Sequence, residues 1–169
     1  DKTIFFYLCR YNYDEIVNLL IDRDEKLIKK KIGNEKQIEN SLLKAAEENE
    51  IEILYYLLLQ QNCIQNNLFK NCEKLEQIAI PPSITSIGEN SFKDCKNLKK
   101  VSIPSSVIEI RENAFFGCSL LNDISIPPFL TEFGDSLFCR CKSLTKIKIN
   151  YPINLIGSHA FIFCYSLTK

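Results

Sequence analysis

The sequence predicts an α/β repeat protein, in which a solenoid of 23-residue coils is capped at its N-terminal end by pairs of helices. Three observations support this fold class. Phe, Cys and Leu recur together every 23 residues in five copies, the second half holds all six prolines, and apolar residues in the first half fall at helical spacing. A fixed period of this length is typical of a solenoid, in which each repeat stacks on the one before it.

Residues 1–62 are expected to form a helical segment. Apolar stretches and turn residues occur twice in the same order, with Asn12 and Asn49 at the expected turns. Each unit predicts a helix, a short turn and a second helix, and Asn suits the turn because it tolerates the left-handed conformation. With Ala45 and Ala46 in the second unit, this pattern resembles a pair of ankyrin repeats. A four-helix cap without ankyrin ancestry is the alternative.

Residues 66–169 are expected to form the solenoid. In one sample coil, Val101 and Ile103 share a face of a short strand, and Pro104 ends the strand because it donates no ladder hydrogen bond. A helical turn then carries the recurring phenylalanine inward. The recurring inward residues are Phe69, Phe92, Phe115, Phe138 and Phe161, then Cys72, Cys95, Cys118, Cys141 and Cys164, and then Leu75, Leu98, Leu121, Leu144 and Leu167.

One coil by itself buries too little apolar surface to offset the conformational entropy of its residues. Each coil therefore needs neighbours above and below it, and the ends of the array must be covered. We expect the N-terminal helices to cover the first coil, against Leu68, Phe69 and Leu75.

The repeated motif reads Ile-x-Ile-Pro-x-x-Val/Ile-x-x-Ile-Gly-x-x-Ala/Ser-Phe-x-x-Cys-x-x-Leu. It resembles the BspA-like class of leucine-rich repeats, known from bacterial surface antigens and large protist families. Two copies depart from it, because Arg111 replaces the usual Gly and Asn150-Tyr151-Pro152 replaces the Ile-Pro step. The resemblance implies a leucine-rich-repeat solenoid that binds partners on its concave strand face.

The eight cysteines allow three interpretations. A disulfide framework fits poorly, because stacked equivalents have parallel Cβ vectors about 4.8 Å apart whereas a disulfide prefers about 3.8 Å. A metal site fits poorly as well, because Cys139 and Cys141 form the one close pair and lack a second pair at ligand spacing. We expect a column of buried free thiols that act as small hydrophobes, with no metal and no cofactor.

No catalytic residues are predicted. His159 is the single histidine, and it occupies a position that Asn90, Asn113 and Ser136 fill in other coils, on an expected solvated helical turn. A Ser-His-Asp or Cys-His site would have to use it, and the five glycines are too scattered for a phosphate-binding loop. We therefore predict that the chain is not an enzyme. A reactive cysteine in the Cys139-x-Cys141 pair would be the evidence against this prediction.

The outward positions of the strand face are the candidate partner-binding residues. They vary in type while their inward neighbours do not, which fits a recognition surface and equally fits an unconstrained one. An aromatic residue near the edge of the face is the expected anchor, since aromatics dominate interface hot spots. The predicted residues are Gln77, Ala79, Lys100, Ser102, Asp123, Ser125, Lys146, Lys148 and Tyr151.

The predicted function is a non-enzymatic protein–protein interaction module, a cytoplasmic scaffold or adaptor. A cell-surface adhesin that binds host or matrix proteins is the alternative. With 21 basic and 21 acidic side chains, the composition argues against a nucleic-acid partner, and no apolar run is long enough for a membrane span. The chain starts at Asp1 without any methionine, so we expect a fragment of a longer protein. An open C-terminal coil with Phe161, Phe163 and Leu167 is expected to allow self-association.

Overall fold

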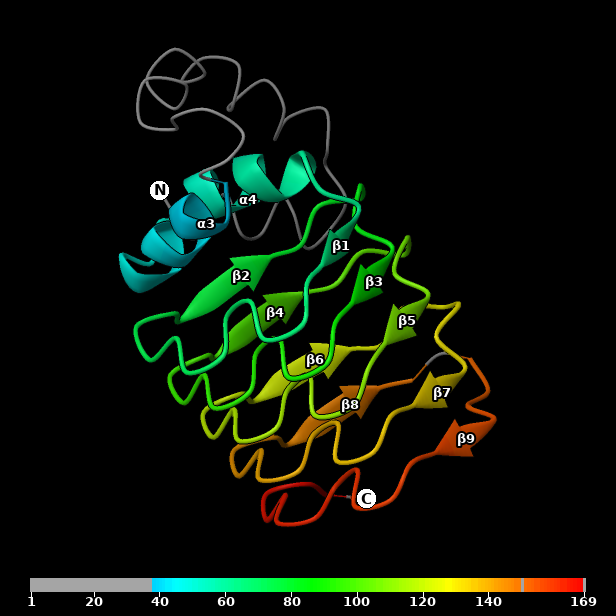
Figure 1. Ribbon diagram of the computed structural model, residues 1–169. Helices are drawn as coiled ribbons and strands as arrows, with labels where there is room; N and C mark the ends of the chain where they lie inside the picture. The colour runs from blue at the N-terminus through cyan, green and yellow to red at the C-terminus, as the bar shows by residue number, and fades with distance from the viewer. Residues whose placement is uncertain (1–37, 150, 169) are drawn as a thin grey trace.

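The computed structural model describes residues 38–149 and 151–168 and forms a solenoid with two helices at one end (Figure 1). The helices are α3 (Ile38–Glu47) and α4 (Ile51–Leu59). The strands that follow are β1 (Cys63–Ile64), β2 (Gln77–Ala79), β3 (Ser86–Ile87), β4 (Lys100–Ser102), β5 (Glu109–Ile110), β6 (Asp123–Ser125), β7 (Glu132–Phe133), β8 (Lys146–Lys148) and β9 (Leu155–Ile156).

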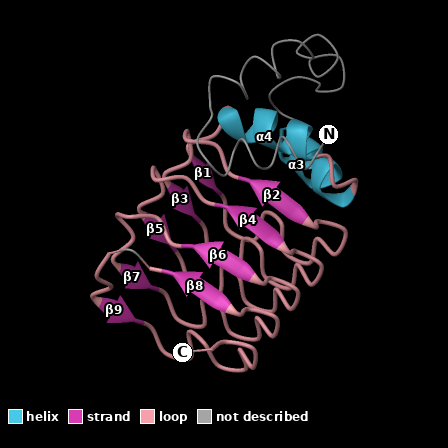
Figure 2. Ribbon diagram, turned by 180° about the vertical axis from the view of Figure 1, so that it is seen from behind, coloured by secondary structure: helices cyan, strands magenta, loops and turns pink. Residues whose placement is uncertain are grey.

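The strands form two layers that run along the solenoid (Figure 2). The long-strand sheet consists of β2, β4, β6 and β8 in that order, and all of its pairs are parallel. Its register pairs Ile78 with Val101 and Ile124 with Ile147, which confirms the predicted columns one repeat apart. The side sheet consists of β1-β3-β5 and, separately, β7-β9. The repeat pattern did not predict this second layer of strands.

The recurring phenylalanines form one continuous stack through the core. The ring centroids of Phe92 lie 5.3 Å from those of both Phe69 and Phe115, and Phe138 follows at 5.8 Å from Phe115. The rings are nearly parallel, and those of Phe69, Phe92, Phe115 and Phe138 are fully buried. A parallel, offset aromatic stack adds to the stabilisation that burial provides. The predicted inward file of rings is therefore confirmed.

The segment before each cysteine is a pair of tight turns, and the predicted helical turn is wrong. In the sample coil the amide of Phe116 donates to the carbonyl oxygen of Asn113 (3.0 Å), and that of Cys118 donates to the carbonyl oxygen of Phe115 (3.3 Å). Asn113 has φ 55° and Gly117 has φ 72°. A left-handed residue every fourth position reverses the chain and prevents a helix from continuing.

The same left-handed positions recur in every described coil. The first file has φ between 54° and 63° and contains Asn67, Asn90, Asn113, Ser136 and His159. Asn and His enter this region more readily than most other residues. The turns also join the coils, since the amide of Phe92 donates to the carbonyl oxygen of Ala114 (2.9 Å). His159 therefore holds an exposed turn position in this file.

The helices cover the first coil, as predicted. The turn between α3 and α4 contains Asn49 with φ 52°, and its Oδ1 accepts a hydrogen bond from the amide of Glu76 (3.1 Å). The Ser83 hydroxyl donates to the carbonyl oxygen of Leu58 (3.2 Å). Buried residues of both helices belong to the same hydrophobic cluster as Leu68, Phe69 and Leu75. No helix in the described part of the chain is long and apolar enough to cross a membrane.

The two expected segments share this core. Strand β1 already pairs with β3 ahead of residue 66, where the solenoid was expected to begin. The first of the two predicted helix–turn–helix units, around Asn12, lies outside the described residues. The second unit is present as α3, Asn49 and α4, with Ala45 and Ala46 buried, and its ankyrin ancestry stays a prediction.

Candidate interaction surfaces

The register of the long-strand sheet brings the predicted partner-binding residues into two files. In the first file, Gln77 pairs with Lys100, Lys100 with Asp123 and Asp123 with Lys146. The second file contains the pairs Ala79 with Ser102 and Ser125 with Lys148. Because neighbouring parallel strands lie about 4.8 Å apart, a single partner can contact several residues of a file at once.

Exposure in the second file increases with distance from the helical cap, and the first file is exposed at Lys100 and Lys146. Lys100, Lys146 and Lys148 are exposed, and Tyr151 is 53% exposed. Three further predicted residues are half-buried, namely Gln77, Asp123 and Ser125. The usable part of the face therefore lies towards β8.

Two of the predicted contact residues are not on the surface. Ala79 is 1% exposed and Ser102 is 7% exposed, so the expectation that they project into solvent is wrong. Ala79 lies on β2, which packs against α4, and Ser102 lies on β4, which pairs with β2. The exposure of a strand residue depends on its neighbours as well as on the strand alternation.

The cysteine column is buried except for the half-buried Cys164, and four of its five thiols donate a hydrogen bond that the sequence did not reveal. The Sγ–H of Cys95 donates to the carbonyl oxygen of Phe69 (2.9 Å), and that of Cys118 donates to the carbonyl oxygen of Phe92 (3.1 Å). Cys141 and Cys164 repeat the contact one and two coils further on. We call the column of Cys72, Cys95, Cys118, Cys141 and Cys164 the cysteine ladder; all cysteines in the described residues are free thiols.

Burial keeps these thiols protonated. Burial, with a smaller effect from the Glu47 carboxylate, raises the pKa of Cys72 from its ordinary 9.0 to about 11. Burial also raises the pKa of Cys118 and Cys141 well above that ordinary value, and raises the pKa of Cys139. Because the thiolate is the nucleophilic form, the fold disfavours reactivity in the Cys139-x-Cys141 pair.

The free energy of unfolding is expected to fall as the pH rises above about 9. Each ladder thiol keeps its proton in the folded chain after the unfolded chain has lost it, so its contribution is complete below pH 9.0 and declines towards pH 11 for Cys72. Between the two pKa values, each thiol lowers the free energy of unfolding by at most about 1.4 kcal/mol per pH unit. Urea unfolding at a series of alkaline pH values measures this dependence.

The matched control for this pH dependence is Cys118→Ser, which retains a donor but does not titrate in this range. Above about pH 9, the free energy of unfolding of the variant is expected to fall less steeply with pH than that of the wild type, by the contribution of one thiol. Equal slopes for the two chains would show that the ladder thiols do not cause the decline.

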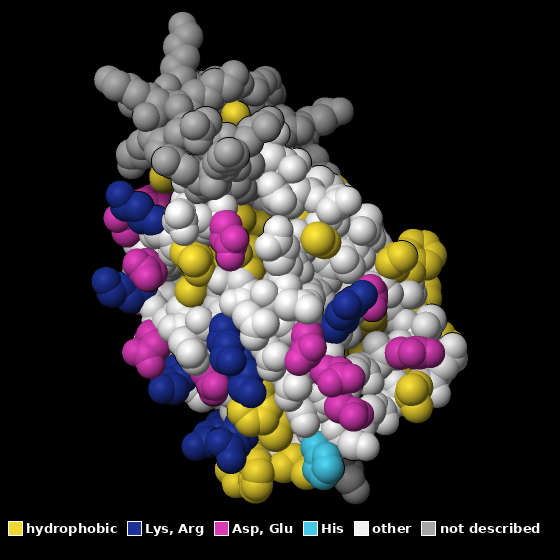
Figure 3. Space-filling model, viewed as in Figure 1, with side chains coloured by type: hydrophobic (Ala, Val, Ile, Leu, Met, Phe, Trp, Pro, Cys, Tyr) yellow, Lys and Arg dark blue, Asp and Glu magenta, His cyan; other side chains and the backbone are white. Residues whose placement is uncertain are grey.

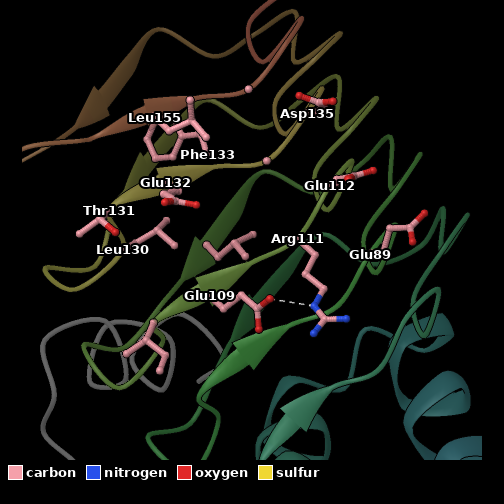
Figure 4. A pocket seen from close by; sticks show the side chains of 14 residues that line it. Glu89, Glu109, Arg111, Glu112, Leu130, Thr131, Glu132, Phe133, Asp135 and Leu155 are labelled. Atoms are coloured by element: carbon pink, nitrogen blue, oxygen red, sulfur yellow. Dashed lines mark hydrogen bonds and ion pairs between the residues drawn. The ribbon is translucent and has the colours of Figure 1, made fainter.

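A groove of about 540 Å³ crosses the side sheet, where no function was predicted (Figure 4). It lies between β5 and β7, which belong to separate sheets, whereas β5 pairs with β3 and β7 pairs with β9. Its lining comes from successive coils and includes Glu109, Arg111, Glu132 and Phe133. The groove therefore coincides with an interruption in the side sheet.

Three sequence differences meet at this interruption. Phe133 occupies the column that holds Ile in other coils, and its ring meets the ring of Phe138 edge-on at 6.0 Å. Glu109 and Glu132 occupy equivalent positions one repeat apart, where paired strands would place two negative charges side by side. Arg111 replaces the recurring Gly. The departures at Phe133 and Arg111 are visible in the sequence, and they are the signal that could have located the groove.

Comparison with known proteins decides the family. The family described as "BspA type Leucine rich repeat region" matches residues 62–169 in six copies. The chain belongs to the BspA-type leucine-rich-repeat family. Membership indicates a protein-interaction module, since repeat solenoids of this kind present extended binding surfaces. No enzymatic family is indicated by the match.

Solved leucine-rich repeat proteins resemble this BspA-type chain. One from T. pallidum is 32% identical with a TM-score of 0.59, and the match covers 62% of this chain and 49% of that one. One from Eubacterium ventriosum is 28% identical with a TM-score of 0.49, covering 56% of this chain and 25% of that one. The BspA-type chain thus spans at most about half of these two proteins. No curated protein matches it.

Proposed function

We propose that this BspA-type chain binds a protein partner on the long-strand sheet, through the charged file on β4, β6 and β8 and the exposed residues beside it. The observation that carries this proposal is the register that places Lys100, Asp123 and Lys146 at Cα-paired positions on successive coils. Lys148 and the aromatic Tyr151 extend the same exposed region. Such a rigid array of charges selects a partner whose own charges have the matching spacing.

A binding experiment on the full chain tests this surface. The face variant Lys100→Glu/Asp123→Lys/Lys146→Glu is compared with the wild type and with the control variant Lys44→Glu/Glu47→Lys/Lys70→Glu. The control carries the same three types of charge change at exposed positions outside the sheet. A partner cross-linked to the wild type is expected to be retained by the control and lost by the face variant. Equal retention by all three chains, or equal loss from both variants, would contradict the proposal.

The setting that we propose is an intracellular scaffold or adaptor. The free, protonated thiols of the cysteine ladder support it, because such thiols persist most readily in a reducing compartment. A cell-surface adhesin is the second candidate, and the bacterial surface antigens that share this repeat favour it. Fractionation of cells that express the full-length protein separates the two settings.

Self-association through the last coil is proposed as well. Of the three residues expected in the open coil, Phe163 is exposed, whereas Phe161 and Leu167 are half-buried. Leu155, Ile156 and Tyr165 are also exposed there, and β8 and β9 each end their sheet in the described part of the chain. Light scattering combined with size-exclusion chromatography of the free chain checks this point, and the mass of a single chain would contradict it.

A further inference from the structure

The groove between β5 and β7 carries an excess of negative charge. Its lining contains five carboxylates and one guanidinium. One file of carboxylates has a member in each of three successive coils, and the second file has a member in each of two. The first file is Glu89, Glu112 and Asp135, and the second is Glu109 and Glu132. In Figure 4 Arg111 lies between the two files, and its Nε is 2.9 Å from Glu109 Oε1.

This arrangement differs from that of two other files on the solenoid, in which neighbouring coils carry opposite charges that form ion pairs. Lys96 Nζ lies 3.1 Å from Glu73 Oε1, and Lys99 Nζ lies 3.0 Å from Glu76 Oε2. In the groove, by contrast, the successive coils carry the same charge. Like charges on neighbouring coils repel one another across the groove, and a cation brought by a binding partner would relieve this repulsion.

The groove also offers apolar surface beside its carboxylates. Ile108 is 60% exposed and Leu155 is 57% exposed, although both line it, while Leu130 and Phe133 are buried. Figure 3 shows acidic and apolar side chains close together on this face of the molecule. Lys and Arg side chains place their aliphatic stems on apolar surface while the charged end stays polar, so this mixed lining matches their chemistry.

We propose that the groove binds an extended cationic segment of a partner protein. Lys or Arg side chains of that segment lie between the two files of carboxylates, with their stems against Ile108 and Leu155. A peptide fits better than a small polyamine, because the groove spans several coils and its exposed apolar residues suit the uncharged side chains of a peptide. The site goes beyond the function proposed above, since it lies on the side sheet instead of the long-strand sheet. Its carboxylates select a positively charged segment.

A fluorescence-anisotropy titration of the full chain tests the site. The probe is a labelled octapeptide in which Lys or Arg alternates with Val. The groove variant Glu112→Gln/Glu132→Gln is expected to bind it about tenfold more weakly than the wild type, because each exposed pair of opposite charges that is lost lowers the affinity by about threefold. The control Glu48→Gln/Glu73→Gln removes the same charge from exposed positions outside the groove and is expected to change the affinity less than about twofold.

Circular dichroism of each variant verifies that the fold is retained. Absence of binding to the wild type, or equal weakening by the groove and control variants, would overturn the proposal. Spermine that binds as tightly as the octapeptide would overturn the assignment to a peptide. The face variant of the long-strand sheet is expected to leave octapeptide binding unchanged, so failure of one site is distinguishable from failure of the other.

Discussion

Replacing Phe115 by Ala is expected to lower the free energy of unfolding by about 3–5 kcal/mol, the cost typical of deleting a fully buried phenyl ring. The Phe115 side chain is 0% exposed, and its ring stacks on Phe92 at 5.3 Å and on Phe138 at 5.8 Å. The substitution therefore removes contacts with the coils on both sides and leaves a cavity. Urea unfolding followed by circular dichroism measures the change.

Phe129→Ala is the matched control, since it deletes the same ring from a side chain that is 67% exposed. Its effect is expected to stay within about 0.5 kcal/mol. If the two substitutions destabilise the chain equally, the continuous phenylalanine stack is not what holds the coils together.

Removing residues 1–60 is expected to convert the solenoid into an aggregating or oligomeric species. The deletion eliminates α3 and α4, whose Leu54, Leu57 and Leu58 are buried in the cluster shared with the first coil. The apolar end of that coil would then face solvent, and terminal repeats need a polar outer surface for solubility. Light scattering combined with size-exclusion chromatography reports the molar mass.

A substitution separates the covering role of the helices from any other effect of shortening the chain. Leu54→Asp/Leu58→Asp places two charges at positions that are 0% exposed, where an unpaired charge is strongly unfavourable. It is expected to reproduce the aggregation in the full-length chain, while Gln60→Asp at an exposed position leaves the chain unchanged. A truncated solenoid that stays soluble and monomeric would disprove the covering role of the helices.

The inward positions were predictable because equivalent positions of successive coils carry the same type of apolar residue. Phe92, Cys95 and Leu98 are each 0% exposed, as the period predicts. The turn at Asn49 was predictable as well, because few residues other than Gly enter the left-handed region as readily as Asn does. Signals of this kind are local or strictly repeated, so they can be read without coordinates.

The candidate binding surfaces were predictable only in part. The pairing of Lys100 with Asp123 and of Asp123 with Lys146 follows directly from the repeat length. The burial of Ala79 does not follow from it, because that depends on α4 packing beside β2. The groove escaped prediction for a similar reason, since a break between β5 and β7 depends on how Phe133 and Arg111 fit against adjacent coils.

The sequence by itself determined the solenoid, its period, its apolar columns and the helices at its start, because each coil must bury the same few positions to fold at all. The tertiary structure alone decided the second layer of strands, the thiol donors of the cysteine ladder and the interruption at β7. Each of these depends on contacts between neighbouring coils, such as the one from Cys118 Sγ to the carbonyl oxygen of Phe92. Such contacts require the register and the shape of both coils, and no single repeat contains that information.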